Sequence, residues 1–184
     1  MQTEAFILKK QPHGEYDQLL TCYTQELGKI TAVAKSSLKQ NSIQGMHLDL
    51  FNHVEFDLVS GRGVPIITGA QVISGYSKLK DSLPSLSAGY FFLEVFDRII
   101  FDYERDDQLW EFLGKLFGNL NGQEIKLADF RQYQKALLQI LGYAPAVLTS
   151  QEQNTRTHSV LDTAFEETAQ ARFSSLRLIY NVLN

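Results

Sequence analysis

The sequence predicts an α+β protein, with a small antiparallel β-barrel in residues 1–80 and an all-helical domain in residues 81–184. Two observations support this prediction. Up to about residue 76, apolar and polar residues alternate, which is the pattern of half-buried strands. After about residue 84, the apolar residues recur every three or four positions, which is the pattern of helices. The two patterns meet at Ser82-Leu83-Pro84-Ser85.

Five strand-like runs, separated by turn-prone clusters, account for the first domain, at residues 4–10, 19–24, 29–35, 48–58 and 64–73. The clearest alternation lies between Leu48 and Leu58, where acidic residues occupy the opposite parity and indicate one wet face. Five short strands without intervening helices are typical of the OB-fold, a five-stranded Greek-key barrel. We therefore expect an OB-fold in residues 1–80.

Helical patterns fill the second domain. We expect one helix capped by Ser85 and extending to Ile100, and a third helix that ends at Gly142, with Pro145 beyond it. This third helix covers residues 127–141. The second helix is expected at residues 106–120, and further helical segments at residues 160–167 and 171–183. Residues 149–159 are polar and without periodicity, which predicts a loop.

The charge of the chain is distributed unevenly. Residues 1–80 contain eight Lys or Arg and seven Asp or Glu, whereas residues 81–184 contain nine and fourteen. If nucleic acid is bound, the N-terminal domain is the better candidate. No apolar run approaches the ~20 residues that span a bilayer, and no secretory signal opens the chain, so we expect a cytoplasmic protein with no membrane contact.

No constellation of catalytic residues is recognisable. The phosphate-binding loop motif is absent, the four histidines lack metal-ligand spacing, and Cys22 lies in an apolar run typical of a buried thiol. Acidic residues cluster at Asp102, Glu104, Asp106 and Asp107. The simpler interpretation is that they lie in a solvated loop at the start of a helix, and the alternative is a pair of catalytic carboxylates. We therefore expect no metal, no cofactor and no enzymatic activity.

Basic residues interleaved with aromatic ones form the remaining pattern, and they lie in or beside the predicted barrel. Single-stranded nucleic acid is bound by cations that follow the phosphates and by aromatic faces that stack on bases. The candidate DNA-binding residues are Lys9, Lys10, Lys29, Lys35, Lys39, Arg62 and Tyr23. Surface lysines are common on barrels, and the alternative is that these aromatic residues belong to the core.

Two stretches of the sequence resemble the RecO family of bacterial recombination mediators. The first contains Gly14-Glu15-Tyr16-Asp17, Thr24, Gly28-Lys29, Ala32-Val33-Ala34-Lys35, Lys39 and Ser42; the second is Leu137-Leu138-Gln139-Ile140-Leu141-Gly142-Tyr143-Ala144-Pro145. The resemblance implies an OB-fold followed by a helical domain. It also implies binding of single- and double-stranded DNA, strand annealing, and help to RecR in displacing single-stranded DNA-binding protein so that RecA can load. Nucleoid association would follow. Lys29, Lys35 and Lys39 match the basic hairpin positions of the family.

The chain departs from the family pattern in three places. Many members have two Cys-x-x-Cys motifs for zinc after the second stretch, whereas Ala146-Val147-Leu148-Thr149-Ser150 follows here. Ser36 stands where the family often has glycine, and the tail after Pro145 is short.

A partner surface is expected on the third helix. Arg131 and Lys135, beside Leu138 and Tyr143, offer cations next to an apolar surface, which would suit the acidic, hydrophobic-ended tail of single-stranded DNA-binding protein. Ordinary packing with an exposed basic edge is the alternative for this helix. For the whole chain, the alternative function is an OB-fold adaptor that binds proteins and has weak or no DNA affinity.

Overall fold

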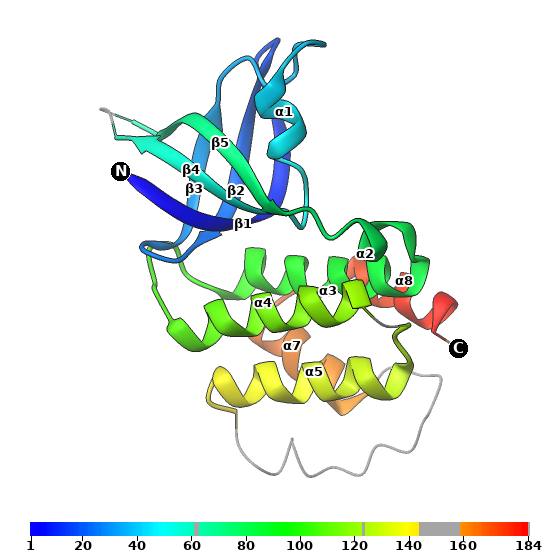
Figure 1. The fold of residues 1–184 in the computed structure, drawn as a ribbon. Helices are drawn as coiled ribbons and strands as arrows, with labels where there is room; N and C mark the ends of the chain where they lie inside the picture. Colours follow the sequence, from blue (N-terminus) through cyan, green and yellow to red (C-terminus); the bar gives the residue numbers. More distant parts are fainter. Residues whose placement is uncertain (61–62, 123, 144–158, 184) are drawn as a thin grey trace. The chain divides into compact units, whose positions relative to one another are not determined.

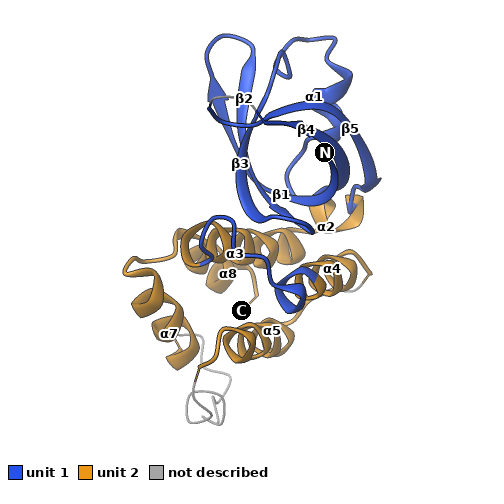
Figure 2. Cartoon of the chain, turned by 90° about the vertical axis from the view of Figure 1, so that its left-hand side faces the viewer, with its two compact units in different colours: residues 1–76, 100–110 blue, residues 77–99, 111–184 orange. Residues whose placement is uncertain are grey.

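A computed structural model describes all of residues 1–184 except 61–62, 123, 144–158 and 184 (Figure 1). The chain divides into two compact units (Figure 2). The first contains residues 1–76 and 100–110, and the second contains residues 77–99 and 111–184. The sequence pattern gives no sign that residues 100–110 belong with the barrel, because they follow the first long helix.

The first unit is a closed five-stranded barrel, as the sequence predicts. Its strands are β1 (Gln2–His13), β2 (Asp17–Thr24), β3 (Gly28–Ala34), β4 (His53–Val59) and β5 (Ile66–Ser74). They pair in the order β1-β2-β3-β5-β4, and only β3 and β5 are parallel among these pairs. The helix α1 (Ile43–His47) lies between β3 and β4 in the chain. The OB-fold predicted from the strand pattern is confirmed.

Alternate side chains of each strand fill the barrel core. In β2 and β3 the inward residues are Leu20, Cys22, Ile30, Ala32 and Ala34, all of which are fully buried. The expected burial of Cys22 is confirmed, and burial raises the pKa of its thiol. The other parity of these strands faces outward and carries the candidate DNA-binding residues of the hairpin.

The fourth strand is shorter than the alternation predicts. Residues 48–52 are not part of it, because Phe51 adopts a left-handed backbone with φ of +67°. Its N–H donates to the carbonyl of Ile7 at 3.1 Å, and Leu48 and Phe51 are still buried. The apolar residues between 48 and 52 therefore predict correctly that this segment packs against the core, but they do not predict its backbone conformation.

The second unit is helical, which confirms the second half of the predicted fold class. Its helices are α2 (Ser77–Asp81), α3 (Leu83–Ile99), α4 (Asp107–Gly122), α5 (Leu127–Ile140), α7 (Val160–Ala169) and α8 (Ser174–Val182), with the first turn of α4 belonging to the first unit. None of the described helices has the length and apolar character needed to cross a bilayer.

The start of α3 differs from the expected one. Ser82, not Ser85, supplies the cap, since the Ser82 hydroxyl accepts from the N–H of Ser85 at 3.4 Å. The Ser85 side chain is itself buried. The start of α8 is also later than expected, because the Glu94 carboxylate of α3 accepts from the N–H of Ser174 and Ser175 and fixes the first turn there.

Candidate nucleic-acid interface on the barrel

The loop after β3 lies beside the turn between β1 and β2, and two of the candidate lysines meet there. The N–H of Leu38 donates to the carbonyl of Tyr16 at 2.9 Å. Lys39 Nζ lies 5.5 Å from the centre of the Tyr16 ring, and Lys35 Nζ lies 3.1 Å from Asp17 Oδ2. The Lys35 side chain is 61% exposed and Lys39 is exposed too, so both ammonium groups are accessible to a phosphate.

Ser36 and Asp17 fix the course of this loop. Ser36 has φ of +55°, a left-handed conformation that favours glycine. Its N–H donates to Asp17 Oδ1 at 2.7 Å. This hydrogen bond, and then the Lys35 ammonium, hold the pKa of the Asp17 carboxyl below its ordinary value. The serine therefore keeps the backbone conformation that glycine would adopt at this position.

Helix α1 packs directly on the same loop. A Cβ added to Gly45 would lie 2.3 Å from the carbonyl oxygen of Ser37, so the close approach requires glycine. The Ser42 hydroxyl accepts from the N–H of Gly45, and Asn52 Nδ2 donates to the carbonyl of His47 at 2.8 Å. Leu48, directly after α1, is fully buried in the barrel core. These contacts fix a helix of only five residues on the barrel.

We call the resulting surface the basic rim. It consists of the exposed basic and large apolar side chains of the β1–β2 turn, the loop after β3 and α1: Tyr16, Lys35, Leu38, Lys39, Ile43 and Met46. The carboxylate of Glu15, in the β1–β2 turn, is exposed beside them. Figure 1 shows α1 and the β1–β2 turn at the same end of the barrel. Residues 35–48 contain two lysines and no aspartate or glutamate.

Two further lysines lie on β1 and are less accessible. Lys10 Nζ is 3.1 Å from Asp49 Oδ1, and its side chain is 22% exposed. Lys9 is partly buried and pairs in register with Thr21 of β2. Arg62 lies outside the described residues.

Lys29 and Tyr23 lie at the other end of the β2–β3 hairpin, away from the basic rim. Six residues separate Lys29 from Lys35, which is about 20 Å along a strand. Residues 100–110, which we call the strap, cover this end. The N–H of Tyr103 donates to the carbonyl of Lys29 at 2.8 Å, and Lys29 Nζ lies 3.3 Å from Asp102 Oδ1.

The strap buries both candidate residues. Lys29 is 8% exposed, and Tyr23 is fully buried. The Tyr23 hydroxyl accepts from the N–H of Asp106 at 3.1 Å and donates to its carbonyl, and burial raises the pKa of Tyr23 to about 12. Neither the ring of Tyr23 nor the ammonium of Lys29 is open to a base or phosphate in this arrangement.

The four residues expected to bind a partner peptide differ in how accessible they are. Arg131 is buried, with its guanidinium 2.9 Å from Asp162 Oδ1 and hydrogen bonded to Gln134 and Tyr180. Burial alone would raise the pKa of Asp162, but Arg131 and the surrounding hydrogen bonds outweigh it and hold that pKa low. This network links α5, α7 and α8 of the second unit.

Leu138 is fully buried in the second unit, whereas Lys135 and Tyr143 are partly exposed. Of the four residues expected to form a cation-and-apolar surface, two are therefore accessible: Lys135 on α5 and Tyr143, three residues after its end. The sequence shows a cation beside apolar residues but not its internal partner Asp162, which is 31 residues away.

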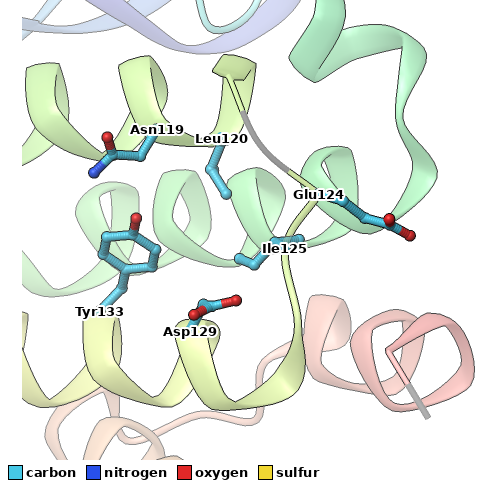
Figure 3. Close-up of a pocket in the computed structure, with 6 residues that line it drawn as sticks. All are labelled: Asn119, Leu120, Glu124, Ile125, Asp129 and Tyr133. Carbon is cyan, nitrogen blue, oxygen red and sulfur yellow. The ribbon is translucent and has the colours of Figure 1, made fainter.

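The second unit also has a small recess between α4 and α5 (Figure 3), with a volume of about 40 Å³. It is lined by Asn119, Leu120, Glu124, Ile125, Asp129 and Tyr133. Sites for small organic ligands have volumes of about 300–1,000 Å³, so this recess does not fit such a ligand. Among the described residues, no three His, Cys, Asp or Glu side chains are grouped as a metal site would need.

Comparison with known proteins places both units in one family. Residues 1–76 match the family model described as "Recombination protein O N terminal", and residues 81–166 match "Recombination protein O C terminal". The chain is 32% identical over 144 residues to DNA repair protein RecO of Roseiflexus sp. (strain RS-1), which covers 78% of this chain and 50% of that protein. It is also 32% identical over 147 residues to DNA repair protein RecO of Nocardioides sp. (strain ATCC BAA-499 / JS614), covering 78% and 60%.

The match thus spans half to three-fifths of the length of these relatives. The N-terminal family model covers the barrel strands and the C-terminal model covers most of the helical unit, in that order along the chain. The chain belongs to the RecO family.

Proposed function

We propose that this chain is a non-catalytic DNA-binding protein of recombination and repair, which binds single-stranded DNA through the basic rim and anneals complementary strands. The observation that supports this best is the position of Lys35 and Lys39. Both are exposed at one end of an OB-fold barrel, and residues 35–48 contain no acidic residue. Family membership supports the same role, since relatives named DNA repair protein RecO match most of this chain.

We propose a smaller set of DNA-contacting residues than the sequence suggests, chosen by the exposure of their side chains. Lys35 and Lys39 are the principal phosphate ligands, and Lys10 and Lys9 extend the track along β1. Arg62 keeps its place in the proposal on sequence grounds alone. Lys29 and Tyr23 are left out, because the strap covers both.

The test is fluorescence-anisotropy binding of the purified chain to a short single-stranded oligonucleotide over a series of salt concentrations. Each phosphate contact on a single strand contributes about −0.7 to the slope of log K against log salt. Changing Lys35 and Lys39 to Gln should therefore reduce the slope by about 1.4, whereas a Lys115→Gln control on α4, which removes an exposed lysine of the second unit, should leave it unchanged. No binding by the wild-type chain at low salt would contradict the proposal, and an unchanged slope would contradict the assignment of the two lysines.

Partners form the second part of the proposal. A RecO-type mediator would bind duplex as well as single-stranded DNA, and would work with RecR to load RecA on strands covered by single-stranded DNA-binding protein. We keep Lys135 and Tyr143 as proposed contacts for the acidic tail of single-stranded DNA-binding protein. Replacing both by Ala should weaken binding of a tail peptide in solution without lowering the melting temperature. Unaltered binding by that variant would contradict these contacts.

The alternative function, a protein-binding adaptor, is favoured by one observation. The strap exposes Phe101 and Tyr103 among acidic residues, which suits a basic protein segment better than DNA. The anisotropy experiment separates the two functions, because an adaptor would not bind the oligonucleotide at low salt.

A further inference from the structure

The basic rim presents large apolar side chains to solvent beside its lysines. Ile43 is 69% exposed, Met46 is 72% exposed, and Leu38 and Tyr16 are 42% and 45% exposed. A segment of fourteen residues, 35–48, thus supplies three of these four side chains together with both lysines. Single exposed apolar residues are ordinary on protein surfaces, but a cluster of this kind indicates a binding surface.

The apolar side chains of the rim are held in place and are not a frayed loop. Gly45 lies between Ile43 and Met46 and approaches the Ser37 carbonyl so closely that no Cβ would fit. The N–H of Leu38 is bonded to Tyr16, and Leu48 anchors the end of α1 in the barrel core. The backbone on both sides of the exposed residues is therefore fixed, while their side chains point away from the core.

The charge around these residues selects the occupant. Lys39 lies over the ring of Tyr16, and Lys35 is exposed on the same loop. Residues 35–48 have no carboxylate. In the β1–β2 turn, the Asp17 carboxylate is paired with Lys35, and Glu15 is the exposed acid beside Tyr16. A ligand that offers regularly spaced negative charges and flat apolar faces matches this arrangement, and unpaired nucleotides have both. In duplex DNA the base faces are stacked inside and only the backbone charges are accessible.

We infer that Tyr16, Leu38, Ile43 and Met46 form a base-contacting surface, on which unpaired bases of single-stranded DNA stack or insert while Lys35 and Lys39 bind the flanking phosphates. This inference rests on the proposed function, and it adds the residues that distinguish a single strand from a duplex. Apolar side chains such as Leu, Ile and Met are known to insert between bases where proteins unstack them. A surface of this kind would hold bases unstacked and open for pairing with a complementary strand.

The experiment compares the unaltered 184-residue chain with the double variant Ile43→Ser and Met46→Ser in the salt series described above. Because the variant removes two apolar side chains that would contact unstacked bases, affinity for the single strand should fall about tenfold. The slope against salt should stay at the wild-type value, because the phosphate contacts remain. Affinity for a blunt duplex of the same length should be unchanged. The matched control is Phe101→Ser, which removes a side chain that is 76% exposed on the strap, and it should bind like the wild type.

The outcomes separate the inference from the function on which it rests. If the lysine variants lower the salt slope but the Ile43→Ser, Met46→Ser variant binds the single strand like the wild type, the inference is wrong and the proposed function stands. An equal loss of duplex affinity, or an equal loss in Phe101→Ser, would also overturn the inference. If the wild type binds no DNA at low salt, the proposed function fails and this inference fails with it. A Tyr16→Ser variant provides an independent measurement, since it leaves α1 intact and should also weaken single-strand binding selectively.

Discussion

The basic rim and the strap occupy opposite ends of the β2–β3 hairpin, and each exposes large apolar side chains. On the rim these are Ile43 and Met46, and on the strap they are Phe101 and Tyr103, with exposed fractions between 64% and 76%. The segments that carry Ile43 and Met46 on the rim, and Phe101 and Tyr103 on the strap, differ in charge. Residues 35–48 have two lysines and no acid, whereas residues 100–110 have four acids and one arginine.

This contrast teaches that exposure of apolar residues does not by itself identify a DNA-binding surface. Acidic side chains near Phe101 would repel phosphate, and the strap uses one of them, Asp102, to pair with Lys29. On the rim, Lys35 also has an acidic partner, Asp17, but its side chain is 61% exposed, and Lys39 is exposed too. The same barrel can therefore present one end to nucleic acid and keep the other for packing or for a basic partner.

The largest effect is expected at the strap end, from Gly28→Ala. Gly28 has φ of +69°, and an added Cβ would lie 2.2 Å from the carbonyl oxygen of Glu104. Left-handed strain and overpacking against backbone should together destabilise the first unit by about 3 kcal/mol. Trp110, the single tryptophan, lies 4.8 Å from the Phe6 ring in this unit, so its fluorescence during urea unfolding reports the loss.

Gly14→Ala is the matched control for this prediction. Gly14 has φ of +71°, but no atom lies within 4 Å of its added Cβ. We expect a cost of about 1 kcal/mol, from backbone strain alone. Equal losses at the two glycines would show that the strap does not press on the β2–β3 turn as the structure has it.

The corresponding change at the rim is Gly45→Ala, for which we expect a smaller loss of about 2 kcal/mol, because overpacking acts without left-handed strain. The added Cβ meets the Ser37 carbonyl oxygen at 2.3 Å, so α1 should move away from the loop. Single-strand affinity should fall as well, since Ile43 and Met46 move with α1. Gly63→Ala, with nothing near its Cβ, is the control for stability. Weakened stability with unchanged DNA affinity would argue against α1 as part of the interface.

A third change makes the rim more like the strap in charge. Gln40 and Gln108 are both exposed, the first on the rim loop and the second beside the strap acids. Gln40→Glu should weaken single-strand binding about threefold at low salt, because one added charge near the phosphates costs a fraction of a kcal/mol to about 1 kcal/mol in water. Gln108→Glu should leave affinity unchanged. Similar losses in the two variants would mean that overall charge, and not the rim, governs binding.

Much of this fold follows from local pattern. Alternation predicts all five strands of the barrel, and helical periodicity predicts the long helices of the second unit. The pattern also places Lys35 at the end of the predicted strand 29–35, one residue past the observed end of β3. The short helix α1 has too few residues to show a period, and its glycine contact with Ser37 is not visible in the sequence.

Long-range contacts explain what the sequence does not reveal. Tyr23 and Lys29 occupy the outward parity of their strands, so a surface position is the correct inference from alternation alone. They are buried because the strap, more than seventy residues later, folds over them. Arg131 likewise looks like a surface cation until Asp162 of α7 is placed beside it. Contacts with a segment that is distant in the sequence cannot be predicted from the local pattern of apolar and polar residues.

The smallest effect is expected from Ser36→Gly on the rim, and its sign is opposite to the others. Relief of the left-handed strain of a non-glycine residue is worth about 1–2 kcal/mol, and the greater freedom of glycine in the unfolded chain costs about 0.4–1 kcal/mol. The net should be a stabilisation of about 0.5 kcal/mol, measured by urea unfolding with Trp110 as the probe. Gln40→Gly, in the same loop but without positive φ, should destabilise by a similar amount. If both variants lose stability alike, Ser36 does not have a strained backbone, and the loop that presents Lys35 and Lys39 takes another course. DNA affinity should stay at the wild-type value in Ser36→Gly, because the hydrogen bond from this backbone N–H to Asp17 is kept.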